Sequence, residues 1–117
     1  QTRCLVLDEP TAMLDPAGRK EVLSTVQALH RSTGITIVYI THFMEEAAAA
    51  DRVIVMEKGR LVEEGVPRSI FQQVERMKNR GLDVPLAAEM AWQLRRQGGP
   101  LPQDIMTDEE LVAALCQ

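Results

Sequence analysis

Two apolar runs with a helical pattern between them open the chain. Residues 4–7 are apolar and lead directly into two acidic residues, and residues 35–41 are rich in β-branched side chains. Runs of this kind are typical of strands that are buried on both faces in a parallel sheet. Between them, an Asp–Pro pair at 15–16 is a helix-start signal, and apolar residues at helical spacing continue up to Gly34, a helix-end signal. The order strand, helix, strand predicts a crossover unit with two parallel strands.

The second half of the chain predicts a hairpin and several helices. Two strands, 52–56 and 60–64, flank a short turn that contains Gly59, which is typical of a β-hairpin. A capping box at 107–110 opens the last helix. The predicted helices of this half cover residues 44–50, 69–80, 85–96 and 111–116.

Together these elements predict an α/β fold in two parts. Residues 1–67 contain the parallel strands and the hairpin, and residues 68–117 form a helical extension. In this extension, Leu86, Met90 and Leu94 are spaced by four and form an apolar stripe on one helix face. The spacing fits packing on the chain itself and packing on a partner helix equally well.

Composition narrows the class of protein without identifying it. Hydrophobic residues make up 45% and charged residues 26%, as in ordinary globular domains, and no apolar run reaches the ~18 residues needed to cross a bilayer. A formal net charge of −4 and an aromatic content of 3% provide no basic or stacking surface, so nucleic acid is not expected as a partner. Cys4 lies in the first apolar run and is expected to be a core residue. The chain lacks an initiator Met and enters a strand almost at once, so we expect it to begin part-way through a longer protein.

Asp8 and Glu9 stand at the carboxyl end of the first predicted strand, where open α/β sheets bind their ligands. Adjacent side chains on an extended chain point in different directions, so two carboxylates can serve two purposes. In phosphoryl transfer, one can hold a metal ion and the other can address the attacking water. Two solvated acids at a strand end would give the same local pattern, so the pair alone does not define a site.

The residues that follow resemble a known family. Residues 8–16, DEPTAMLDP, resemble the Walker B and D-loop segment of the ATP-binding-cassette (ABC) ATPases. His42 ends the next strand in the sequence Ile-Thr-His, which resembles the switch-histidine loop, and residues 51–62 resemble the hairpin that follows. Order, spacing and identity agree over roughly residues 3–67. The resemblance implies the C-terminal part of a P-loop NTPase core.

The resemblance also implies roles and cofactors. Asp8 would hold Mg²⁺ through water, Glu9 would act as the general base on the attacking water, and His42 would contact the γ-phosphate of ATP. Asp15 belongs to the D-loop, which in this family crosses the dimer interface and couples two ATP sites. Its helix-capping role, argued above from the Asp–Pro pair, is compatible with this.

Three motifs of the same family do not occur in the sequence. The phosphate-binding loop G-x-x-x-x-G-K-S/T, the glutamine loop and the L-S-G-G-Q segment are all missing, and in ABC proteins they precede Walker B. We therefore predict that the 117-residue chain alone neither binds ATP tightly nor hydrolyses it. Mg²⁺-dependent ATPase activity of the purified chain would contradict this prediction.

The tail carries a second resemblance. Ser69-Ile70-Phe71, the sequence GLDVP at 81–85 and the segment 105–112 look like the C-terminal extension of energy-coupling factor (ECF) transporter ATPases, the importers of vitamins and of cobalt or nickel. This implies an ATPase at the cytoplasmic face of the membrane. Its partners would be a second ATPase subunit, identical or paralogous, a transmembrane coupling subunit and a substrate-binding membrane subunit. In that family the extension helps to hold the two ATPases together.

Two other functions stay open on the sequence. One is a different ABC ATPase, either from another importer or exporter or from DNA repair or translation. Repair and translation factors usually continue into a coiled coil or a second cassette, and neither pattern is present. The other is a truncated, non-catalytic dimerisation module. The transported substrate is not readable from these residues.

Overall fold

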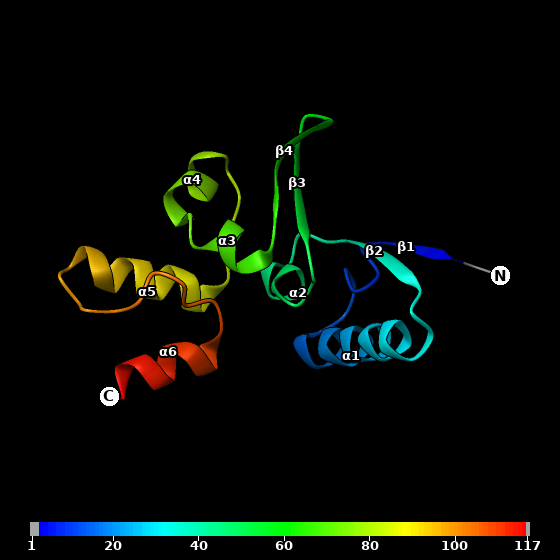
Figure 1. Cartoon of the computed structure of the whole chain (residues 1–117), viewed down its shortest axis with the longest axis horizontal. Coiled ribbons are helices and arrows are strands. Elements are labelled where there is room, and N and C mark those ends of the chain that lie inside the picture. Colours follow the sequence, from blue (N-terminus) through cyan, green and yellow to red (C-terminus); the bar gives the residue numbers. More distant parts are fainter. Residues whose placement is uncertain (1–2, 117) are drawn as a thin grey trace. The chain divides into compact units, whose positions relative to one another are not determined.

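The computed structural model describes residues 3–116 and divides into two compact units, Gln1–Phe43 and Met44–Gln117 (Figure 1). The hairpin therefore groups by contacts with the C-terminal helices. The domain boundary predicted near Pro67, between residues 1–67 and 68–117, stays a prediction. Within residues 3–116, none of the helices combines the length and apolar character that crossing a bilayer requires.

The first unit is the predicted strand–helix–strand motif. Strand β1 (Cys4–Asp8) is followed by helix α1 (Pro16–Thr33) and strand β2 (Thr36–Ile40), and the two strands pair in parallel. Asp15 caps α1, because its Oδ1 accepts a hydrogen bond from Gly18 N at 2.8 Å. Gly34 ends the helix at a φ of 72°, a left-handed conformation that glycine adopts without steric cost. Both predicted helix signals and the parallel pairing are confirmed.

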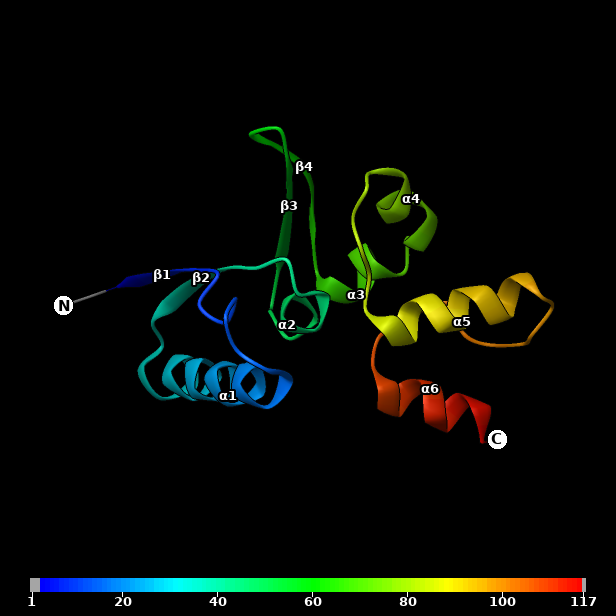
Figure 2. The same cartoon turned by 180° about the vertical axis from the view of Figure 1, so that it is seen from behind.

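The expected burial of these strands on both faces is wrong for this chain. Residues along β1 and β2 alternate between exposed and half-buried, and Cys4 is exposed instead of belonging to a core. Figures 1 and 2 both show α1 running alongside the strand pair. A single helix covers one face of a two-stranded sheet, so alternate residues such as Val6, which is 59% exposed, keep contact with water.

The second unit begins with helix α2 (Met44–Ala48) and the predicted hairpin. Strands β3 (Val53–Glu57) and β4 (Arg60–Gly65) pair antiparallel, with an irregularity of register between Val55 and Met56. The turn places Lys58 and Gly59 at φ of 50° and 76°. Two successive positive φ values are typical of the tight turns that suit the twist of a hairpin.

Four helices follow: α3 (Pro67–Phe71), α4 (Val74–Asn79), α5 (Leu86–Arg96) and α6 (Asp108–Leu115). The single helix predicted over residues 69–80 is wrong, because the backbone leaves the helical region at Gln73, with φ −91° and ψ 59°. The apolar residues Ile70, Phe71, Val74 and Met77 have the spacing of one continuous helix face. Periodicity alone therefore does not reveal the break.

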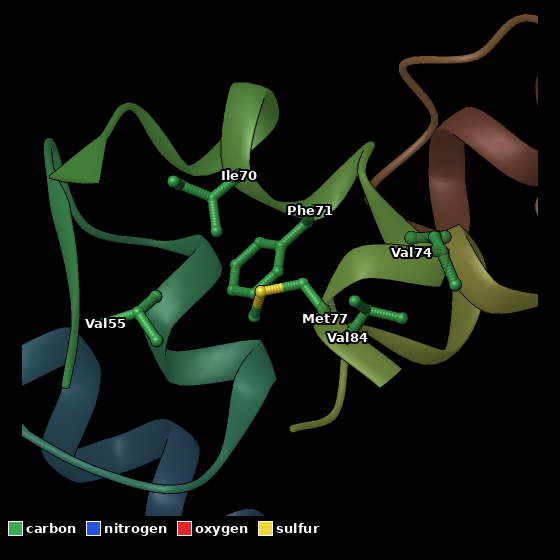
Figure 3. Packing of buried hydrophobic residues seen from close by; sticks show 7 residues of the cluster. Val55, Ile70, Phe71, Val74, Met77 and Val84 are labelled. Carbon is green, nitrogen blue, oxygen red and sulfur yellow. The ribbon is translucent and has the colours of Figure 1, made fainter. Parts of the chain in front are cut away.

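These residues build the core of the second unit. Ile70, Phe71, Val74 and Met77 pack with Val55 of the hairpin and with Val84 (Figure 3). Phe71 and Met77 are among the largest fully buried side chains. A second cluster joins α5 to α6 through Ala87, Ala91, Ile105 and Leu111.

The apolar stripe predicted on α5 does not face this core. Leu86 and Met90 are 60% and 45% exposed, and Leu94 is half-buried. Three alanines, Ala87, Ala88 and Ala91, are the buried residues of the helix. The small side chains let neighbouring segments approach α5 closely, whereas Leu86 and Met90 lie toward water.

The predicted capping box at the start of α6 is confirmed, and its glutamate also contacts α3. Thr107 Oγ1 accepts from Glu110 N, and Glu110 Oε1 accepts from the backbone N–H groups of Met106 and Thr107 at 3.0 Å each. Glu110 Oε2 also pairs with Arg68 Nη1 of α3 at 2.7 Å. Partial burial raises the pKa of Glu110, but the two backbone hydrogen bonds and Arg68 outweigh it and lower that pKa below its ordinary value.

We expect this carboxylate to make stability depend on pH. A lowered folded-state pKa contributes stability that is present above the ordinary pKa of the group and is lost as the pH falls through the lowered value. Glu110→Gln should reduce the free energy of unfolding by less than about 1 kcal/mol at neutral pH. The difference from wild type should shrink in acid, as urea unfolding at several pH values would show. Glu109→Gln, at an exposed neighbouring position, is the matched control. An equal pH dependence in both variants would contradict the prediction.

Candidate functional site

The carboxyl ends of β1 and β2 lie side by side in the first unit. Asp8, the last residue of β1, is in register with Ile40, the last residue of β2. One residue further on, Glu9 N donates a hydrogen bond to Ile40 O at 2.8 Å. The loops that leave the two strands therefore start from the same edge, as the parallel pairing predicts.

Glu9 leaves the strand in an uncommon backbone conformation. Its φ is 48°, in the left-handed region, where a residue with a side chain is rarely found. Such a conformation costs about 1–3 kcal/mol and tends to cluster at functional sites. Here the hydrogen bond to Ile40 O holds it in place. The observed backbone therefore marks Glu9 as a candidate for function.

The side chains of Glu9 and His42 meet at this edge. His42 Nδ1 lies 2.7 Å from Glu9 Oε1. A carboxylate only accepts hydrogen bonds, so this contact requires the proton on Nδ1, while Nε2 is left to address another group. The second carboxylate oxygen of Glu9 likewise remains for a further donor, such as a water.

This pair contributes little to stability. The two side chains are 66% and 48% exposed, for His42 and Glu9 respectively, and exposed ion pairs contribute about 0–1 kcal/mol. The strained backbone of Glu9 costs as much or more. The arrangement is therefore better explained by chemistry at an open site than by folding.

Asp8 and Asp15 stand at the two ends of the loop between β1 and α1, and they differ in what the structure shows of them. Asp8 is exposed at the end of β1, and an exposed carboxylate fits Mg²⁺, which is commonly bound by one or two carboxylates together with waters and phosphates. Among residues 3–116, no group of three or more His, Cys, Asp or Glu residues forms a metal cluster. Asp15 caps α1 as described, which accounts for its carboxylate locally. Their proposed nucleotide roles remain predictions.

The loop between β1 and α1 is compact at its start and exposed at its tip. Thr11 is only 1% exposed, and its carbonyl accepts a hydrogen bond from Leu14 N at 3.0 Å. Met13, at the tip, is 96% exposed. The loop therefore exposes the apolar side chain of Met13 to solvent, while Thr11 at its start is buried.

Two further residues support the site, and sequence analysis missed both. Phe43 follows His42, and their ring centroids are 4.5 Å apart. Arg19 of α1 lies over the ring of Phe43, with Cζ 4.3 Å from the centroid. The two residues are 24 positions apart, and nothing in the pattern of the chain connects them. His30, the other histidine, bonds to Ile35 O through Nδ1 at 2.8 Å, which fits a structural role.

A comparison with a solved structure identifies the class of this fold. A solved structure of cbiO1 from Clostridium perfringens, part of the ABC transporter complex cbiONQ, matches 82% of this chain and 35% of its own, with a TM-score of 0.58 and 32% identity. The chain therefore has the fold of part of an ABC ATPase, and the predicted α/β class is confirmed.

Sequence relatives specify the group within that class. Residues 85–117 match the family described as Energy-coupling factor transporter EcfA1 C-terminal domain. Two curated relatives are energy-coupling factor transporter ATP-binding proteins EcfA1. The one from Clostridium perfringens is 56% identical to this chain over 98% of it, and the one from Symbiobacterium thermophilum is 58% identical over 97%. The chain spans about two fifths of the length of these curated relatives, 41% and 40%. The predicted resemblance is confirmed: the chain corresponds to the C-terminal part of an ABC ATPase of the ECF group.

Proposed function

We propose that this chain is the C-terminal part of the ATP-binding subunit of an ECF-type importer, in which ATP hydrolysis drives uptake of a vitamin or a transition-metal ion. The observation that supports the proposal is the 2.7 Å contact between Glu9 and His42 at the ends of two parallel strands. The names of the relatives support the transport setting. The chain alone is proposed to be inactive.

The chemistry follows from the atoms left unengaged at the site. Glu9 accepts from His42 through Oε1, so its second oxygen can take a proton from the attacking water. His42 holds Glu9 in place through Nδ1 and presents Nε2 to the terminal phosphate of ATP. Asp8 would hold Mg²⁺, which neutralises charge on the phosphate oxygens. Asp15 fixes the start of α1 and thereby the loop that, in the proposed assembly, faces a second ATPase.

The proposed assembly places this subunit at the cytoplasmic face of the membrane. It would pair with a second ATPase subunit and with two kinds of membrane subunit, one coupling and one substrate-binding. The solved neighbour cbiO1 is itself part of an ABC transporter complex, which supports this arrangement.

The proposal is tested on the completed ATPase, meaning this chain preceded by the upstream half with its phosphate-binding loop. That half is taken from the same reading frame or, as a chimera, from the Clostridium perfringens relative. We expect Mg²⁺-dependent ATP hydrolysis, and recovery of membrane subunits when the tagged protein is purified from its source membranes. No hydrolysis by the completed protein would overturn the catalytic proposal. Hydrolysis without any membrane subunit would overturn the transport proposal in favour of a non-transport ABC ATPase.

A further inference from the structure

One guanidinium group in the first unit contacts both loops of the candidate site. Arg19 Nη1 donates to Leu14 O at 3.2 Å, which lies in the loop between β1 and α1. The same group lies over the ring of Phe43, in the loop that follows β2. Arg19 is half-buried, unlike the exposed Lys20 beside it. Contacts within the protein therefore hold the guanidinium group of Arg19 in place.

The contact continues from Phe43 to the catalytic pair. The Phe43 ring packs on the imidazole of His42 with an interplanar angle of 31°. The backbone of this loop is fixed as well, because Phe43 N donates to Thr41 Oγ1 at 2.9 Å. His42 in turn bonds to Glu9. A continuous series of contacts thus runs from Leu14 through Arg19 and Phe43 to His42 and Glu9.

Helix stability does not explain an arginine at this place. Arg19 lies in the first turn of α1, and that turn contains no acidic residue. The positive end of the helix dipole is at the N-terminus, so a cation there is unfavourable. The contacts with Leu14 and Phe43 offset this cost, which indicates that the contacts are the reason for the residue.

We propose that Arg19 is a positioning residue that couples the loop of residues 10–15 to the orientation of His42. The inference rests on the proposed function, since it concerns the residue that would address the phosphate. Arginine suits this role because its planar group offers an edge to a carbonyl and a face to an aromatic ring at the same time. A displacement of Leu14 breaks the edge contact and releases the group that packs on Phe43. Because Leu14 and Met13 are 40% and 96% exposed, a second protein that binds this loop has direct access to the coupling.

The kinetic test uses the completed ATPase with Arg19→Ala, Arg19→Lys and Phe43→Leu. Each should lower kcat about tenfold and leave KM for ATP within about twofold, because no group proposed to bind the nucleotide is removed and only the orientation of His42 is lost. Arg19→Lys keeps the charge but not the planar group, so it should behave like Arg19→Ala. Phe43→Tyr keeps the ring and should retain the wild-type rate. Lys20→Ala, which removes the neighbouring cation, is the matched control.

The double variant Arg19→Ala/Phe43→Leu separates coupling from general damage. If the two residues act in one series, the double variant is no slower than either single variant. Multiplied losses of about a hundredfold would overturn the proposal, as would wild-type kcat in Arg19→Ala. If Arg19→Ala does not fold, the comparison of Phe43→Leu with Phe43→Tyr still tests the link to His42.

A second measurement keeps this inference distinct from the proposed function. In the 117-residue chain, imidazole ¹⁵N NMR signals of His42 should shift in Arg19→Ala, whereas those of His30 serve as an internal reference and stay in place. A His42 shift in a protein whose completed form hydrolyses no ATP would support the coupling and reject only the proposed function. Normal hydrolysis with no His42 shift would reject only the coupling.

Discussion

Replacing Glu9 with Gln should abolish turnover of ATP by the completed ATPase and leave nucleotide binding intact. Glutamine has the size of glutamate and keeps an oxygen that accepts from His42 Nδ1, so the 2.7 Å contact is preserved. What is lost is the basic oxygen that, in the proposed function, takes the proton of the attacking water. Removal of a general base costs about 10²–10⁴-fold in rate, which is a far larger effect than any other change in this chain is expected to have on catalysis.

The measurement is single-turnover hydrolysis together with retention of bound nucleotide. We expect Glu9→Gln to bind ATP with an affinity near that of wild type and to hold it unhydrolysed. Glu21→Gln, at an exposed position of α1, is the matched control and should turn over normally. Retained turnover in Glu9→Gln would remove Glu9 from the role of general base. Loss of binding as well as turnover would assign Glu9 to substrate binding instead.

The sequence predicted where in the fold the candidate site lies, but it did not predict the detailed geometry of that site. Parallel strands bring their carboxyl ends to one edge, and this rule alone puts Glu9 and His42 near each other once both strands are recognised. The direct hydrogen bond and the left-handed backbone of Glu9 depend on the particular course of one loop, which no periodicity encodes. The contact of Arg19 with Phe43 is likewise a tertiary contact between residues far apart in the chain.

The buried faces of the helices were predicted less well, because a search for apolar periodicity depends mainly on large side chains. On α5 the spacing of Leu86 and Met90 was the conspicuous pattern, yet both are largely exposed. The buried face is made of alanines, whose small size makes close packing possible but gives a weak signal. The break between α3 and α4 escaped detection for a related reason, since the apolar residues on either side of it keep helical spacing.

Burial of the first strand was overestimated for a different reason. A continuous apolar run such as residues 4–7 is typical of a strand with cover on both faces. Within residues 3–116, β1 pairs with β2 alone, and exposed residues alternate along both strands. An apolar run shows that its residues are suited to burial on both faces of a sheet. Whether both faces are buried in a given chain depends on which other segments pack on the sheet.

Replacing Phe71 with Ala should have the largest effect on the stability of the second unit. Phe71 is 1% exposed and lies among Ile70, Val74 and Met77 (Figure 3). Truncation of a buried Phe to Ala removes apolar burial and leaves a cavity, at a cost of about 3–5 kcal/mol. That is a large part of the stability of a small domain, which is commonly about 5–15 kcal/mol.

Urea unfolding of the chain measures this effect, with the fluorescence of Trp92 as the probe. Trp92 is the single tryptophan and packs against the same core, so its signal reports on this unit. Leu86→Ala removes a large apolar side chain that is 60% exposed, and it should change stability by no more than about 0.5 kcal/mol. If Phe71→Ala does not fold, Phe71→Leu, with a smaller change of volume, should still cost about 1 kcal/mol. Equal losses at Phe71 and Leu86 would mean that burial at Phe71 does not hold this unit together, because Phe71 is buried and Leu86 is largely exposed.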